Sequence, residues 1–182
     1  MTSTRTLAPG RVSAHAAGRG RCDVTATAKA ILVGVISDTH GLLRPQAIAA
    51  LRGSDLIIHA GDVGHPDVLA PLRAVAPLHV VRGNVDTGAW ARALPETERV
   101  DVGGHIIHVL HNIADLGRDP AAAGFAAVIY GHSHKPSIET RDGVLWLNPG
   151  SAGPRRFDLP ISLARLHVTA NELRPELVTL SV

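Results

Sequence analysis

The stretch ILVGVISDTH, residues 31–40, carries the strongest fold signal in this chain. Its aliphatic run Ile31–Ile36 has the length of a buried strand and is too short for an ordinary helix. The run leads into the polar residues Asp38-Thr39-His40, and a helix signal with proline in its first turn follows at Pro45–Leu51. A strand, a polar loop and a helix in this order predict an α/β domain wound with parallel strands.

The same alternation continues downstream. We expect a second strand at Leu56–His59, a helix at Asp67–Val75 and a third strand at Leu78–Val81. Later strands come mostly as hairpins around turn signals such as Gly103-Gly104. They are expected at Val100–Val102, His105–Leu110, Ala126–Tyr130, Ile138–Thr140, Val144–Leu147, Ile161–Val168 and Leu173–Leu180. The pattern predicts a mixed two-sheet α/β domain over residues 30–182.

Length and composition exclude several classes of protein. The 182 residues fit one domain, and 45% hydrophobic with 19% charged residues is a globular composition. Apolar runs such as Ala121–Tyr130 fall short of the ~18 residues that a membrane helix needs. The single cysteine, Cys22, excludes an intrachain disulfide and a cysteine-based zinc finger. We therefore expect a globular domain that does not span a membrane.

Charge divides the chain near residue 30. Residues 1–29 carry five basic residues and one acid, a net +4, so the total of +2 leaves −2 for residues 30–182. A mildly acidic body argues against a nucleic-acid-binding surface, which needs clustered basic residues. Residues 1–29 lack apolar periodicity and are predicted to be a disordered N-terminal extension, although an Arg-rich, acid-poor leader also fits a transit peptide. No secretory h-region follows, so we expect a cytoplasmic protein.

Side chains that can bind metals follow five of the predicted strands. In open α/β sheets, ligands bind at the carboxyl ends of the strands, so residues scattered along the sequence converge there. Turn preference favours Asp and Asn but not His, and it does not explain the pattern. The candidate ligands are Asp38, His40, Asp62, Asn84, His111, His132 and His134.

Seven donors are too many for one tetrahedral ion and suit two ions that share a carboxylate. Mixed imidazole and carboxylate donors favour transition metals over calcium or magnesium. Two such ions ~3.5–4 Å apart can hold a hydroxide and clamp an in-line displacement at phosphorus. We expect two divalent transition-metal ions, manganese first, with nickel, iron, cobalt or zinc as alternatives.

These blocks resemble the signature of the calcineurin-like metallophosphoesterase superfamily. In order, they are Asp38-Thr39-His40, Gly61-Asp62, Gly83-Asn84-Val85-Asp86, His111 and Gly131-His132-Ser133-His134. Asn148-Pro149-Gly150-Ser151 further resembles the small, single-domain bacterial and archaeal phosphodiesterase branch, which also includes a eukaryotic retromer scaffold subunit. The resemblance covers about residues 31–182, and five ordered blocks are far more specific than one short motif.

The resemblance implies a fold, a set of metal ligands and a reaction. The fold is a four-layer α/β/β/α sandwich with two mixed β-sheets. Asp62 bridges two metals, and Asp62, Asn84 and His40 are the implied catalytic residues. The reaction is hydrolysis of a small phosphate ester, most simply a phosphodiester, by a metal-bridging hydroxide. The first metal is held by Asp38, His40 and His134, and the second by Asn84, His111 and His132.

Two positions depart from the superfamily pattern. Val85 stands where many members have a histidine proposed to protonate the leaving group. The fourth block usually contains His-Gly-His, and here His111 is followed by Asn112-Ile113. The metal site should survive both changes, whereas the identity of a general acid is open.

Several other polar residues receive weaker assignments. Asp86 could orient Asn84 or His40, or could cap a turn. Asn148 and Ser151 could lie over the metals or belong to a plain turn. Lys135, Arg155 and Arg156 are candidates for phosphate contact. Among the remaining histidines, His59 is expected to pack or to support the ligands, His65 and His79 to face solvent, and His105 and His108 to be structural.

Two classes of function fit these observations. The first is a binuclear metal-dependent phosphoesterase that acts on a small phosphate ester. The second is a protein-interaction scaffold on the same fold with weak or absent catalysis. Seven converging donors favour the enzyme, because a scaffold does not need them. The sequence leaves open the physiological substrate and whether the chain forms a homo-oligomer.

Overall fold

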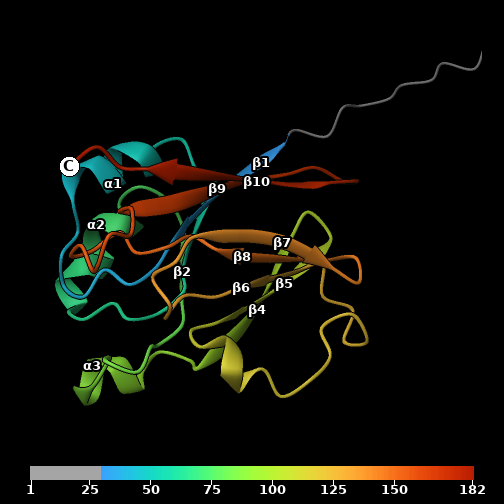
Figure 1. Cartoon of the computed structure of the whole chain (residues 1–182), viewed down its shortest axis with the longest axis horizontal. Helices are drawn as coiled ribbons and strands as arrows, with labels where there is room; N and C mark the ends of the chain where they lie inside the picture. The colour runs from blue at the N-terminus through green and yellow to red at the C-terminus, as the bar shows by residue number, and fades with distance from the viewer. Residues whose placement is uncertain (1–29) are drawn as a thin grey trace, which may run out of the picture.

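A computed structural model describes residues 30–182, and the predicted disordered extension, residues 1–29, lies outside this part. Two five-stranded mixed sheets pack face to face (Figure 1). The first sheet has the order β10-β9-β1-β2-β3. Its strands are β1 (Ile31–Ile36), β2 (Leu56–His59), β3 (Leu78–Val80), β9 (Ser162–Val168) and β10 (Leu173–Thr179). Strands β1, β2 and β3 are parallel, and β9 pairs with β1 in the antiparallel direction.

The second sheet has the order β4-β5-β6-β8-β7. Its strands are β4 (Thr97–Val102), β5 (His105–Leu110), β6 (Ala127–Ile129), β7 (Ser137–Arg141) and β8 (Val144–Asn148). Strands β5, β6 and β8 run parallel, and the antiparallel edges are the hairpins β4–β5 and β7–β8. Asp142 and Gly143 both have positive φ at the turn of the second hairpin, as the Asp-Gly signal predicts.

Three apolar layers hold the sandwich together. The central layer, which includes Val33, Ile58, Ile107 and Leu147, fills the space between the sheets. A second layer lies beneath α1 (Pro45–Leu51) and α2 (Leu69–Arg73) on the outer face of the first sheet. A smaller cluster around Val128 lies on the outer face of the second sheet, beneath a 3₁₀ turn, η2 (Ile113–Asp115). The two mixed sheets with helices outside confirm the predicted α/β sandwich.

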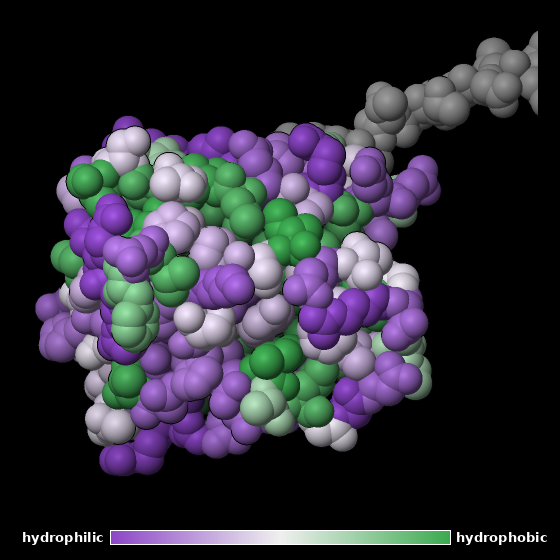
Figure 2. Space-filling view, viewed as in Figure 1, coloured by the Kyte–Doolittle hydropathy of each residue, from purple (hydrophilic) through white to green (hydrophobic). Residues whose placement is uncertain are grey.

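Apolar residues are used mostly inside the molecule. On the face that Figure 2 shows, hydrophobic surface forms separate patches between hydrophilic areas. No helix within residues 30–182 is long and apolar enough to span a bilayer.

Two helical segments differ from the sequence prediction. The helix expected at Asp67–Val75 is a 3₁₀ turn, η1 (Pro66–Val68), followed by the short α2. Pro71 has no N–H with which to bond the carbonyl of Asp67, so a single α-helix cannot begin at Asp67. Pro71 lies instead in the first turn of α2, where its N–H needs no partner within the helix. A five-residue helix, α3 (Gly88–Arg92), lies where the sequence pattern predicts neither a helix nor a strand. It is too short to show apolar periodicity in the sequence.

Candidate metal centre

The seven predicted ligands gather at one edge of the sandwich, because each follows the carboxyl end of a strand. They come from the loops after β1, β2, β3, β5 and β6. Five of the seven have a left-handed backbone, with φ from 46° to 68°: Asp38, His40, Asp62, His132 and His134. This conformation is uncommon for residues other than glycine, and such strain clusters at functional sites. Backbone hydrogen bonds between the first two loops, such as His40 N–H to the Asp62 carbonyl at 3.0 Å, hold it in place.

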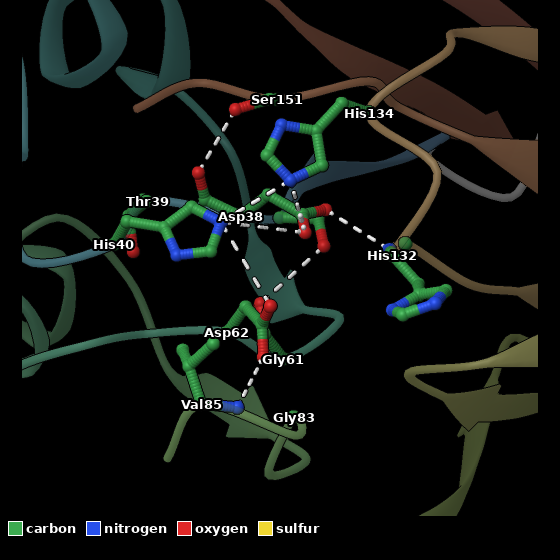
Figure 3. A network of polar contacts seen from close by, with 12 residues as sticks. Asp38, Thr39, His40, Gly61, Asp62, Gly83, Val85, His132, His134 and Ser151 are labelled. Atoms are coloured by element: carbon green, nitrogen blue, oxygen red, sulfur yellow. Dashed lines mark hydrogen bonds and ion pairs between the residues drawn. The ribbon is translucent and has the colours of Figure 1, made fainter. Parts of the chain in front are cut away.

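The first cluster consists of Asp38, His40 and His134. Figure 3 shows both imidazole rings turned towards the Asp38 carboxylate. His134 Nε2 lies 3.2 Å from Asp38 Oδ1 and 3.2 Å from His40 Nε2. The Asp38 side chain is fully buried, and His134 is nearly so. Three donor atoms therefore point at one small volume, which is open to solvent only beside the partly buried His40.

Asp62 lies between this cluster and the next. Its Oδ2 is 3.8 Å from His40 Nε2, and its Oδ1 is 3.3 Å from His111 Nε2. The backbone N–H of Val85 donates to Asp62 Oδ1 at 3.0 Å, which fixes the carboxylate (Figure 3). Asp62, Asp38 and His111 also place one donor atom each within 4.8 Å of one another.

The second cluster consists of Asn84, His111 and His132. Asn84 Oδ1 lies 3.1 Å from His111 Nε2 and 2.9 Å from His132 Nδ1. His111 Nδ1 is 2.8 Å from the Ala60 carbonyl, where it donates a proton, so the Nε2 lone pair is free for a metal. His111 is buried, whereas Asn84 and His132 are exposed. The second cluster is thus open to solvent on one side.

A cavity of about 370 Å³ adjoins the second cluster. Its walls include all three ligands of that cluster, together with Arg82, Glu96 and Asn112. The Asn112 side chain accepts the N–H of Ala114 at 3.1 Å and caps η2. The cavity offers a substrate direct access to the open cluster.

The residues present fit divalent cations. Asp38 Oδ1 is buried and makes no hydrogen bond within residues 30–182, so a cation at this point would satisfy it. Two carboxylates, four imidazoles and one amide oxygen form the donor set, which is typical of transition metals. The structure thus brings all seven predicted ligands together.

The ionisation of Asp62 and His40 also favours cation binding, whereas that of His111 does not. Burial alone would raise the pKa of Asp62, but hydrogen bonds from His111 and Val85 and the nearby imidazoles hold that pKa below its usual value. Burial lowers the pKa of His40, against the opposing influence of Asp62 and Asp38. Burial also acts to lower the pKa of His111, but its hydrogen bonds to Asp62 and Ala60 raise it overall. At neutral pH the site therefore offers an ionised carboxylate beside the imidazole of His40 in its neutral form.

The sequence suggested three supporting residues, Asp86, Asn148 and Ser151. Their side chains form hydrogen bonds with backbone groups of the ligand loops rather than lie over the metal site. Asp86 accepts N–H groups of Val63, Gly64 and Gly83 at 2.7–3.1 Å, and so ties the loops after β2 and β3 together. It thereby positions the segment before Asn84 without bonding to the Asn84 or His40 side chain.

Asn148 and Ser151 act on other ligand loops. The Asn148 amide donates to the Gly131 carbonyl at 2.8 Å and to Ser133 Oγ at 3.1 Å. The Ser151 hydroxyl donates to the Asp38 carbonyl at 2.9 Å (Figure 3). Both residues thus shape the loops that carry the ligands.

His59 supports the first loop from behind. Thr39 Oγ1 donates to the Val63 carbonyl at 3.0 Å and accepts from His59 Nε2 at 2.9 Å. Complete burial lowers the pKa of His59 to about 4, so its ring is neutral. His79 differs from expectation, because its Nδ1 bonds Glu98 at 2.6 Å instead of facing solvent alone.

Sequence reasoning missed the role of two glycines at the site. A Cβ at Gly83 would collide with the Asp62 carboxylate, and one at Gly131 would collide with Ser37 Oγ and the Asp38 carboxylate. The carboxylates of Asp62 and Asp38 therefore pack directly against the backbone at Gly83 and Gly131. The signal was present, because each glycine directly precedes a predicted ligand, Asn84 or His132.

The paired sheets and the His, Asp and Asn clusters at their carboxyl ends define a metal-binding α/β sandwich. The family model described as "Calcineurin-like phosphoesterase superfamily domain" matches residues 31–171. The chain therefore belongs to the calcineurin-like phosphoesterase superfamily.

Known proteins share the sequence and the fold. A probable metallophosphoesterase from Methanothermobacter thermautotrophicus is 31% identical over 81% of this chain and 92% of its own length. A Streptococcus pneumoniae structure described as a "predicted phosphoesterase" is 26% identical, with a TM-score of 0.65 over 84% of this chain and 91% of its own. The structure of Entamoeba histolytica Vps29 in complex with zinc is 24% identical, with a TM-score of 0.62 over 82% and 99% of the two chains.

Proposed function

We propose that this protein is a binuclear metal-dependent phosphodiesterase. The observation that carries the proposal is the place of Asp62, whose two oxygens face His40 of one cluster and His111 of the other. A carboxylate between two imidazole-rich clusters suits two neighbouring ions. The superfamily and the name of the archaeal relative support phosphoesterase chemistry.

Each cluster would hold one ion, and Asp62 would contact both. Two divalent ions held in this way supply Lewis acidity and an activated water for an in-line displacement at phosphorus. With the carboxylates of Asp38 and Asp62, the loaded site carries a formal charge of about +2 and attracts a phosphate anion. Asn84 presents its Oδ1 to His111 and His132, which leaves its amide N–H groups to donate to a phosphoryl oxygen in the adjoining cavity.

Neither position at which the superfamily carries a candidate general acid holds a histidine in this chain. Val85 is 40% exposed at the rim and cannot donate from its side chain. Asn112 follows His111 in the fourth block, which lacks the usual second histidine, and its side chain caps η2. We therefore propose diesters with good leaving groups, such as aryl diesters, as the preferred class of substrate. A diester also presents only one negative charge to the site.

Metal content and turnover test the proposal. The purified chain, loaded with manganese, should contain about two ions. It should hydrolyse bis(4-nitrophenyl) phosphate faster than 4-nitrophenyl phosphate and lose this activity in EDTA. Readdition of manganese, nickel, iron, cobalt or zinc in separate samples identifies the preferred ion. Turnover that persists without metal, or one ion per chain at full activity, would refute the binuclear mechanism.

A scaffold remains the second candidate, because Vps29 shares this fold. In that case the chain would bind metal without turnover of any diester or monoester. A stable complex with a protein from the native host, together with turnover at the level of a metal-free control, would favour the scaffold.

A further inference from the structure

The segment 154–158, Pro-Arg-Arg-Phe-Asp, forms an exposed loop next to the metal centre. It is the orange loop that leads into β9 in Figure 1. All five residues are exposed, and Phe157 has 87% of its surface in solvent. Phe157 also has a left-handed backbone, with φ 54°. Positive φ is uncommon for an aromatic residue, and such backbone strain clusters at functional sites.

This loop is fixed directly to the loop of the first cluster. Ala152 N–H donates to the Ser37 carbonyl at 3.1 Å, and the Arg44 guanidinium donates to the Gly153 carbonyl at 3.3 Å. Gly153 lies so close to the backbone of Asp38 and Thr39 that a Cβ would collide with their carbonyl oxygens. The segment 154–158 thus begins on the backbone that carries two metal ligands.

Two unpaired positive charges lie in the segment. Within residues 30–182, neither Arg155 nor Arg156 has an ion-pair partner. Arg156 lies three residues after Gly153, which packs against the backbone of Asp38 and Thr39, so its guanidinium can reach the edge of the first cluster. An unpaired guanidinium beside the centre is suited to a phosphate oxygen.

Exposed apolar side chains are present in two ligand loops and in segment 154–158. Large hydrophobic residues are exposed at six described positions, and three of these lie in loops of the metal centre. Leu42 is two residues after His40, Val85 follows Asn84, and Phe157 lies in the segment above. A guanidinium and an aromatic ring beside a cationic site fit an organic phosphate that carries a flat, apolar group.

We propose that segment 154–158 recognises the substrate: Arg156 binds the phosphoryl group, and Phe157 stacks on an aromatic ring of the ester. The inference rests on the proposed phosphodiesterase function and adds a substrate class, phosphate esters that bear an aryl group or a nucleobase. Arg156 and Phe157 thus determine substrate specificity, and neither is one of the seven predicted metal ligands.

Binding of two small probes to the manganese-loaded full chain tests this inference. Diphenyl phosphate carries rings and dimethyl phosphate carries none, and NMR titration gives both dissociation constants. Phe157→Ala should weaken diphenyl phosphate about tenfold and leave dimethyl phosphate unchanged. Phe157→Tyr should retain the parent affinity, and Arg156→Ala should weaken both probes severalfold.

Matched controls come from the exposed strand β10. Leu177→Ala and Arg174→Ala remove an apolar side chain and a guanidinium there and should leave both dissociation constants unchanged. Metal content is measured in every variant and should equal that of the parent.

Equal affinity of Phe157→Ala and the parent for diphenyl phosphate overturns the inference, even if diesters are hydrolysed. If no ester is hydrolysed but diphenyl phosphate binds in a Phe157-dependent way, the recognition segment stands and the proposed reaction fails.

Discussion

The two halves of the metal centre are built differently. Asp38 and His134 of the first cluster are buried. The Ser151 hydroxyl donates to the Asp38 carbonyl, and His59 forms a hydrogen bond with Thr39 in the same loop. Asn84 and His132 of the second cluster are exposed and line a cavity. A closed cluster favours retention of its ion, whereas an open cluster leaves coordination positions for water and substrate.

This difference assigns separate tasks to the two halves. All three residues of the closed half, Asp38, His40 and His134, have a left-handed backbone, which needs the surrounding hydrogen bonds to persist. The open half supplies the face that a phosphate ester meets. Stability should therefore depend mostly on the first half, and turnover on both.

The largest effect is expected at Asp62, the residue between the halves. Asp62→Ala should empty both sites and reduce turnover to background, because both clusters lose their shared carboxylate. His134→Ala should mainly empty the closed site and lower the melting temperature, and His132→Ala should mainly empty the open site. Metal analysis and calorimetry of the three variants measure these outcomes. Loss of one and the same ion in all three would contradict the bridging role of Asp62.

Val85→His sharpens the comparison on the open side. A histidine there could protonate the leaving group, which is typically worth ~10²–10⁴-fold in rate. The parent rate should fall steeply as the leaving-group pKa rises, and the variant should recover about 10²-fold on the poorest leaving groups. A series of methyl aryl phosphates, whose phenols differ in pKa, provides the measurement. A flat dependence in the parent would mean that another acid already acts.

Gly83→Ala tests how tightly Asp62, the carboxylate between the two halves, is packed. The new methyl group would displace the Asp62 carboxylate, and overpacking of this kind costs about 1–3 kcal/mol. We expect lower metal affinity and a lower melting temperature. Gly117→Ala is the matched control, because its Cβ would meet no atom within 4 Å and should change neither property. Equal behaviour of the two variants would show that Asp62 has room to move.

His59 gives the smallest effect, behind the closed half. Its folded pKa of about 4 lies below the ordinary value of 6.5. The unfolded state therefore binds a proton between these pH values that the folded state does not. The free energy of unfolding should fall by up to about 1.4 kcal/mol per pH unit as the pH drops from 6.5 towards 4. Urea unfolding of the metal-free chain at several pH values shows this slope.

His59→Gln is the comparison for that slope. Glutamine can still donate to Thr39 but does not titrate, so the variant should lose this part of the pH dependence. His40 and His108, whose pKa values are also lowered, act in the same direction in both proteins and cancel in the difference. Identical slopes would contradict a neutral, buried His59.

The sequence predicted much of this architecture because its signals were local. Strand β1 and helix α1 lie at the predicted bounds, and the seven candidate ligands converge as strand-end reasoning expects. The roles of these ligands remain proposals. Helix α3 was not predicted because five residues are too few to show a helical period. The single helix predicted at Asp67–Val75 is divided into η1 and α2, because Pro71 cannot donate a hydrogen bond to Asp67.

The backbone roles of Asp86, Asn148 and Ser151 could not be inferred in the same way. Each depends on hydrogen bonds to residues that are distant along the chain, such as Ser151 to the Asp38 carbonyl. Packing of Gly83 against Asp62 is equally non-local. Residue types at strand ends indicate which side chains meet, whereas the support beneath them emerges only from the assembled sheets.

The pairing of β1 with β9 has a consequence for how the protein is made. Val33 pairs with Leu56 of β2 on one side and with Leu166 of β9 on the other, so the central strand of the first sheet gains its second neighbour only after nearly the whole chain has been synthesised. Contacts between such distant residues slow folding, since a long loop must close first. The loop that carries Asp38 and His40 leaves the end of β1 and is held by Ser151 shortly before β9. A ribosome-bound nascent chain should therefore acquire its first metal cluster last, after β9 has left the exit tunnel.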